Sequence, residues 1–194
     1  MSKILIIAEH DGHQLNPATA KCVSCASKVG GEIHIAVFAA DGAAIAAEAA
    51  QIEGVSGVIQ VNDAKFGHAL AAVIAPEVVA LASGYSHVFA PSSTFGKDLL
   101  PRVAALLNVN QVSDIMAVSG SHQFKRPIYA GNAIIDVEAP AGLPVVATVR
   151  TASWPAAAAG SATATITNTS ASAADPGHTR YVGLSSSGSD RPDL

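Results

Sequence analysis

Apolar runs alternate with helical repeats along the first 115 residues. The short runs are rich in Ile, Val and Ala, which is typical of strands buried on both faces of a sheet. The expected strands are residues 4–8, 33–39, 55–61, 85–90 and 111–115, and the expected helices are residues 17–29, 43–51, 66–83 and 95–108. This alternation predicts an α/β fold of three layers, a doubly wound and mostly parallel sheet with helices on both faces.

Local residues mark several helix boundaries. Asn16 is a preferred N-cap, Pro17 is a preferred first helical residue, and the pair Gly30-Gly31 should end that helix. Pro76 lies inside the expected helix at residues 66–83, where it should kink the helix or mark a break.

The pattern changes after residue 115, where strand-like segments follow one another with no room for helices. They cover residues 115–118, 123–129, 133–139 and 145–150. We predict an antiparallel meander that extends the main sheet or forms a small second one. Pro127 cannot donate a ladder hydrogen bond, which suggests an edge strand. With Lys125, Arg126 and Tyr129, this edge suits the docking of a partner, and an ordinary solvated edge explains the pattern equally well.

The chain after Trp154 consists mainly of Ala, Ser, Thr and Gly. Residues 162–169 alternate and predict one more strand, and residues 180–184 predict another. Residues 185–189 have the serine-rich composition of a flexible linker.

Small polar residues follow the fourth expected strand, at the end where parallel sheets usually bind ligands. Ser92, Ser93 and Thr94 can cap the next helix, and Gly96 and Lys97 lie in its first turn. A helix N-terminus of this kind can hold a small anion, although a capped helix with a solvated lysine is the simpler interpretation. The sequence contains neither G-x-G-x-x-G after its first strand nor a Walker pattern.

Composition and charge narrow the classes of partner. The chain has 194 residues and a net charge of −4, which gives no indication of binding to nucleic acid or anionic membranes. Charged residues make up 13% of it and apolar residues 49%, and a surface so poor in charge is easier to explain if another subunit covers part of it. No apolar run has the length of a membrane span, and Met1-Ser2-Lys3 leads directly into the first strand. We therefore expect a bacterial cytoplasmic protein.

Two clusters of residues resemble a metal site and a redox site, and for both a purely structural role is the simpler explanation. His10, Asp11 and His13 lie in one turn without a third strong ligand nearby, so we expect a solvated loop rather than a metal site. Cys22 and Cys25 form C-x-x-C in the second turn of a helix, where the dipole does not activate a thiol. We expect packed, inert cysteines. No catalytic residue and no metal ligand is predicted.

Three segments resemble the N-terminal domain of the electron transfer flavoprotein alpha subunit. They are LNPAT at 15–19, FGKDLLPRVAA at 95–105 and RPIYAGNA at 126–133, and AEHD at 8–11 and TVR at 148–150 also fit. The resemblance covers the whole chain and implies the adenine-nucleotide alpha-hydrolase-like version of the α/β fold. It also implies an N-terminal domain at residues 1–184 and a linker at 185–194 toward an FAD-binding domain that this chain lacks.

The resemblance implies an electron carrier rather than an enzyme. In that family the alpha subunit pairs with a beta subunit, and the heterodimer carries one FAD. It accepts electrons from dehydrogenases, such as the acyl-CoA dehydrogenases of fatty acid oxidation, and passes them to a membrane quinone reductase. The segment present here would be the scaffold that packs with the beta subunit, with no cofactor-binding residue of its own.

We expect the interface with the beta subunit to include the helix after residue 94 and the edge at 126–132. The candidate contacts are Gly96, Lys97, Arg102, Arg126, Tyr129 and Asn132, and we expect Arg102 to pair with a carboxylate, either inside this domain or across the interface. The alternative is a free-standing nucleotide-binding domain of the stress-protein type. That interpretation requires a phosphate-binding loop, for which residues 92–97 are the candidate.

Overall fold

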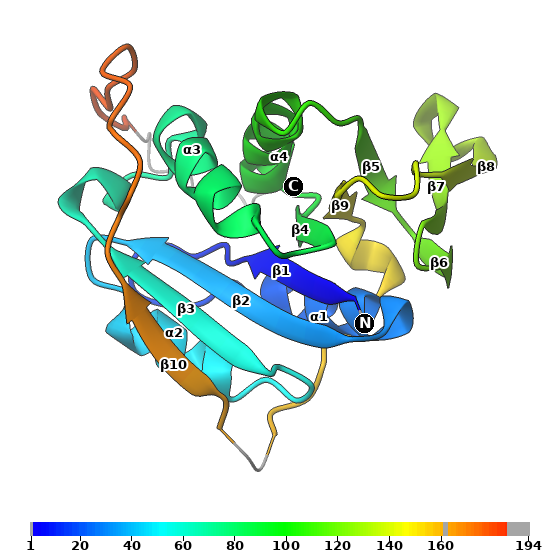
Figure 1. The fold of residues 1–194 in the computed structure, drawn as a ribbon, viewed down its shortest axis with the longest axis horizontal. Coiled ribbons are helices and arrows are strands. Elements are labelled where there is room, and N and C mark those ends of the chain that lie inside the picture. The colour runs from blue at the N-terminus through cyan, green and yellow to red at the C-terminus, as the bar shows by residue number, and fades with distance from the viewer. Residues whose placement is uncertain (1, 161–162, 186–194) are drawn as a thin grey trace.

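A computed structural model describes residues 2–160 and 163–185 of the chain (Figure 1). Within these residues a sheet of seven strands, all parallel to their neighbours, forms the middle layer. In spatial order the strands are β10 (Thr165–Thr169), β3 (Gly57–Asn62), β2 (Glu32–Ala39), β1 (Lys3–Ile7), β4 (His87–Pro91), β9 (Val145–Val149) and β5 (Gln111–Ile115). The predicted α/β class is confirmed.

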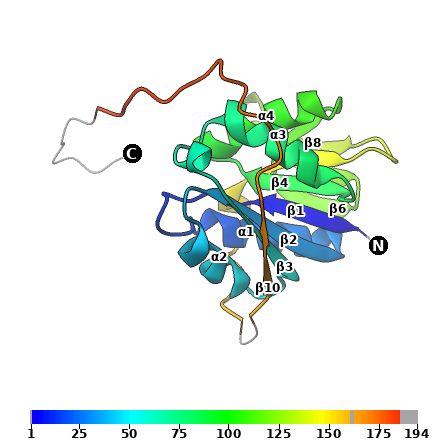
Figure 2. The ribbon, with the colours of Figure 1, turned by 60° about the vertical axis from the view of Figure 1, so that its left-hand side comes forward.

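Helices cover both faces of this sheet (Figures 1 and 2). On one face lie α1 (Ala18–Val29) and α2 (Ala43–Ala50), and on the other lie α3 (Ala71–Ala82) and α4 (Thr94–Leu106). The chain winds outward from β1 to β3 with α1 and α2, and then crosses back through α3 to β4 on the other side of β1. Right-handed crossovers place helices on opposite faces when the winding direction reverses, and the reversal falls between β1 and β4.

The helix ends follow mostly from local chemistry. The Asn16 side chain accepts a hydrogen bond from the Ala18 backbone N–H at 2.9 Å, and Gly30 with φ 81° follows the last residue of α1. The helix expected from residue 66 begins later, at Ala71, because the 3₁₀ turn η1 (Ala64–Phe66) is a separate element. Pro76 does not break α3, which continues through it to Ala82.

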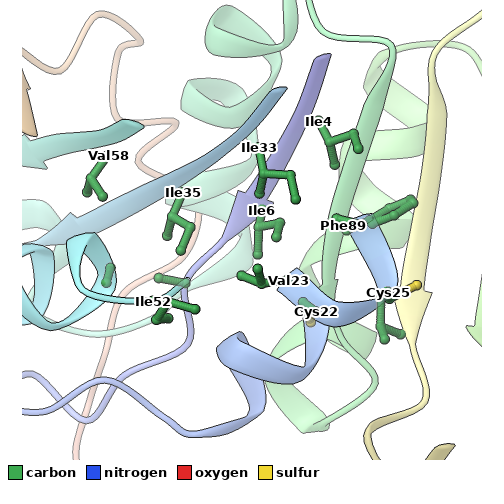
Figure 3. Packing of buried hydrophobic residues seen from close by; sticks show 14 of the residues in the cluster. Ile4, Ile6, Cys22, Val23, Cys25, Ile33, Ile35, Ile52, Val58 and Phe89 are labelled. Carbon is green, nitrogen blue, oxygen red and sulfur yellow. The ribbon is translucent and has the colours of Figure 1, made fainter. Parts of the chain in front are cut away.

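Each face of the sheet has its own apolar cluster. On the side of α1, the buried Cys22, Val23 and Cys25 pack with Ile6 and Phe89 of the sheet (Figure 3). On the other side, residues of α3 and α4 pack against the opposite face of the same strands. Because the central strands are buried on both faces, they carry the unbroken apolar runs from which they were predicted.

A second, smaller sheet contains β6 (Ala117–Gly120), β7 (Gln123–Ile128) and β8 (Ala133–Glu138), all antiparallel. The predicted meander is thus correct for these strands. The prediction was wrong for the fourth segment, because β9 is not antiparallel: it lies in the main sheet between β4 and β5 and is parallel to both. The edge assignment of β7 was also wrong, since β7 is the central strand. Pro127 is tolerated there because the pairing with β6 ends at Lys125, so its missing N–H faces no partner.

Two short elements complete the described chain, η2 (Tyr129–Gly131) and η3 (Thr151–Ser153). The predicted strand at 162–169 is confirmed as β10, with residue 162 outside the described residues. The strand predicted at 180–184 was wrong, because these residues form no strand in the structure. Of the predicted linker at 185–194, all but Ser185 lies outside the described residues. No described helix combines the length and apolar character needed to cross a bilayer.

Candidate functional site

The turn between β4 and α4 lies at the carboxyl edge of the sheet, beside the point where the winding reverses. The Ser93 Oγ caps α4 by accepting from the Gly96 N–H at 3.4 Å. Gly96 itself is buried, and a Cβ added there would lie 1.9 Å from the Pro91 carbonyl oxygen. Gly96 is therefore a position of close backbone approach within this chain. It was predicted as a contact with the beta subunit, and in the structure it is buried.

A carboxylate lies against the same helix N-terminus. The Ser93 Oγ–H donates to Glu9 Oε2 at 2.8 Å, so the side chain that follows β1 reaches across to the turn that follows β4. A negative charge is favourable at this end of a helix. Because Glu9 already supplies it, a phosphate placed here would meet a like charge rather than an open anion site.

The two cations predicted on α4 are exposed. Lys97 makes no side-chain hydrogen bond to the described residues. Arg102 donates from Nη2 to His178 Nε2 at 3.3 Å. No carboxylate of the described residues pairs with Arg102, so a carboxylate across the interface stays the prediction for this side chain.

Arg126 of β7 joins the small sheet to the main sheet. Its Nε donates to the Ser113 carbonyl at 2.7 Å, and its Nη2 donates to Ser113 Oγ at 2.8 Å. Ser113 lies where the register of β5 against β9 is interrupted, and the neighbouring Asp114 has a positive φ of 61°. Arg150 forms an ion pair with Asp114 at 2.6 Å. The guanidinium of Arg126 is thus half-buried, and its donors bind groups of this chain. Arg150 is a second arginine at the interruption of the β5–β9 register, and it was not among the predicted site residues.

The loop between β7 and β8 displays an aromatic ring. Tyr129 is 79% exposed, and the three residues from Tyr129 to Gly131 all have positive φ. The left-handed region is unfavourable for a tyrosine and an alanine, at about 1 kcal/mol or more each. Asn132 supports the loop by donating from Nδ2 to the Tyr129 carbonyl at 2.8 Å. Ile134 on β8 is 56% exposed and pairs with Pro127, so the loop and the adjacent strands form an apolar corner.

The two cysteines are inaccessible thiols in the α1 cluster (Figure 3). Burial raises the pKa of the Cys22 and Cys25 thiols well above the ordinary value. A thiolate is the reactive form of cysteine, so neither side chain has the features of a redox or metal site. The prediction of packed thiols is confirmed.

The turn after β1 is held by its own hydrogen bonds. His10 binds the Phe38 carbonyl through Nε2 at 2.8 Å and accepts from the Gly12 N–H through Nδ1 at 3.1 Å. Hydrogen bonds from the backbone N–H groups of Gln14 and His13 hold the pKa of Asp11 below its usual value. Across the described residues, no group of three or more His, Cys, Asp or Glu side chains has the arrangement of a metal site.

Comparison with known proteins gives one consistent family. The family model for the electron transfer flavoprotein domain matches residues 4–174. The chain is 46% identical over 191 residues to electron transfer flavoprotein subunit alpha of Pseudomonas aeruginosa, a match that covers 98% of this chain and 61% of that protein. It is 45% identical over 192 residues to the alpha subunit of Paracoccus denitrificans, with the same coverage. The mitochondrial alpha subunit of Arabidopsis thaliana is 37% identical over 205 residues. The chain therefore spans about three-fifths of the length of these relatives.

Proposed function

This chain belongs to the electron transfer flavoprotein family, and we propose that it acts as the part of an alpha subunit that packs against a beta subunit. The resemblance to the alpha subunit, first carried by the segments at 95–105 and 126–133, is confirmed by the relatives. In our proposal residues 1–184 are the scaffold and residues 185–194 lead toward an FAD-binding domain. The assembled protein carries electrons from dehydrogenases to a quinone reductase and catalyses no bond chemistry in this scaffold.

The observation that carries the proposal is the apolar corner at Tyr129 and Ile134. A strained loop that exposes a tyrosine is disfavoured in an isolated domain, and such strain persists at functional positions. Exposed Tyr side chains are also frequent in the energetically important centres of protein interfaces. We therefore assign Tyr129, Asn132 and Ile134 to the centre of the beta-subunit contact. Lys97 and Arg102 belong to its polar rim, and Arg126 supports it by holding β7 against β5.

The flavin is not expected to bind at the turn after β1 or at the turn between β4 and α4, because neither of these turns suits a pyrophosphate. Glu9 occupies the N-terminus of α4, and Asp11 lies in the turn after β1 with its carboxylate already accepting two backbone N–H groups. The same observation disfavours the alternative of a stress-protein-like nucleotide-binding domain. That function would require an anion site at 92–97, where the chain has placed its own carboxylate.

The test is a binding titration of this chain with an immobilised beta subunit of the same family and source. The double variant Tyr129→Ala/Ile134→Ala should bind at least about tenfold more weakly, since truncating a central interface residue typically costs more than about 1 kcal/mol. Leu143→Ala removes a similarly exposed apolar side chain from the β8–β9 loop and should change the affinity less than about twofold. Unchanged affinity of the double variant, with a native circular dichroism spectrum, would show that the corner is not the interface.

A further inference from the structure

An ion pair that has no place in the proposed interface is buried between η1 and α3. The Lys65 Nζ lies 2.8 Å from Glu77 Oε1, and the side chains of Lys65 and Glu77 are only 14% and 3% exposed. Buried ion pairs are costly unless further hydrogen bonds satisfy their remaining polar atoms. The bonds that do so here come from the segment after β10, almost a hundred residues further along the chain.

The pair binds the main chain of that segment. Glu77 Oε1 accepts from the Ala173 N–H at 2.9 Å, and Glu77 Oε2 accepts from the Ser172 N–H at 3.0 Å and the Ser172 Oγ–H at 3.1 Å. Lys65 donates to the Ala173 carbonyl at 2.6 Å. Three of these four bonds involve backbone atoms, so the recognition depends little on which side chains the segment carries.

A second contact holds the segment farther along. The Tyr181 ring stacks on the His68 imidazole with centroids 3.6 Å apart and an interplanar angle of 17°. Both rings line a cavity of about 900 Å³ at the carboxyl ends of β1, β2 and β3, together with His10, Phe66 and Leu70. Tyr181 therefore forms part of the wall of this cavity. Between the two contacts, His178 accepts a hydrogen bond from Arg102 of α4.

We propose that Lys65 and Glu77 form a receptor for the backbone of residues 172–173, which holds residues 170–181 as a strap that closes one side of the cavity at the carboxyl edge. The strap follows directly from β10, and the receptor binds it at Ser172 and Ala173, shortly after it leaves the sheet. When the receptor is lost, the strap leaves α3 while the sheet and its helices remain folded. The cavity then loses the wall that Tyr181 provides.

Because the receptor binds backbone atoms, a substitution that removes the backbone N–H of residue 173 should release the strap. Ala173→Pro removes the N–H that donates to Glu77 Oε1 and substitutes no residue of α3 or η1, whereas Ala173→Ser keeps the N–H and is the matched control. In hydrogen exchange followed by mass spectrometry, the amides of residues 171–181 should exchange at least about tenfold faster in Ala173→Pro, because local opening is then no longer opposed by the receptor. Ala173→Ser should exchange like the wild type, and peptides from β1 and β4 should be unchanged in both variants.

Glu77→Gln tests the same proposal by changing the receptor instead of the strap. Its amide keeps the shape of the carboxylate but loses the charge and one acceptor atom, so the strap should again exchange faster. The proposal is overturned if residues 171–181 of the wild-type chain exchange as fast as an unstructured peptide. It is also overturned if Ala173→Pro leaves their exchange unchanged, or if the serine and proline variants behave alike. These measurements need no beta subunit, so their outcome is independent of the interface proposed above.

Discussion

Gly96→Ala adds a single methyl group at the point where α4 approaches the end of β4 most closely. The new Cβ would lie 1.9 Å from the Pro91 carbonyl oxygen, whereas a carbon–oxygen contact normally needs about 3.3 Å or more. The obstacle is a backbone atom of a buried strand and cannot rotate away. α4 would have to move by roughly 1 Å, although Leu99, Leu100 and Val103 hold it in the core.

The expected loss of stability follows from three contributions. Forcing extra volume into a packed core costs about 1–3 kcal/mol, and the rigid backbone neighbour favours the upper value. Displacing the first turn of α4 weakens the Ser93 cap, which is worth about 1 kcal/mol. Alanine is better than glycine inside a helix by about 1 kcal/mol, which offsets part of the loss. The net expectation is a destabilisation of about 3 kcal/mol, or a fall in melting temperature of roughly 6–12 °C for a chain of this size.

Urea denaturation followed by circular dichroism measures this loss. Gly57→Ala is the control, because its new Cβ would meet its nearest neighbour, His34, at an ordinary 3.5 Å, so its midpoint should change little. A Gly96→Ala variant as stable as the wild type would refute the assignment of Gly96 to close packing. Gly96 could then contact the beta subunit, as the sequence predicts.

Three further outcomes follow from buried groups. Cys22 and Cys25 should react with a thiol reagent only as fast as the chain unfolds, and changing both to alanine should leave electron transfer by a full-length complex intact. Burial tends to raise the pKa of Glu77, but hydrogen bonds from Lys65, Ser172 and Ala173 hold it below its ordinary value of 4.5. Glu77→Gln should therefore be less stable than the wild type at pH 7, by about 3 kcal/mol, with the difference in urea midpoints shrinking as the pH falls below 4.5. Burial lowers the pKa of His87 below its ordinary 6.5, so its contribution to stability is present above pH 6.5 and is lost as the pH falls below it. Replacing His87 with glutamine should flatten that part of the pH profile, and equal slopes would contradict the assignment.

Most of the fold was predictable because the local sequence of each core strand is typical of a strand. The strands β1 to β5 are short apolar or β-rich runs, and α1, α2 and α4 have the spacing of helices with one buried face. The strand β9 was predicted as part of an antiparallel meander, but it is parallel to both of its neighbours, and its sequence contained that distinction. Val145–Val149 is an unbroken run buried throughout, whereas Ala133–Glu138 in β8 alternates between partly buried and exposed residues. Alternation is typical of a sheet with one solvated face, and an unbroken run is typical of a parallel strand covered on both faces.

The candidate site was less predictable, because its contacts join distant segments. The sequence predicted Tyr129 and Asn132 as contacts on a docking edge that carries two cations, but not the positive φ at Tyr129. Arg126 looked like a free cation, since nothing in the sequence places Ser113 beside it. The partners of Glu77 lie almost a hundred residues away, and no local pattern connects them. Such pairings depend on register and on bulges, which periodicity does not encode.

The central claim is that this chain is a scaffold for a beta subunit and holds no flavin of its own. Native mass spectrometry of the purified chain, mixed with its beta subunit and an excess of FAD, tests it in one experiment. We predict a one-to-one complex of the two chains, and a free-chain peak at the mass of the polypeptide alone. A free chain that carries one FAD, or a mixture in which the two chains never associate, would contradict the account.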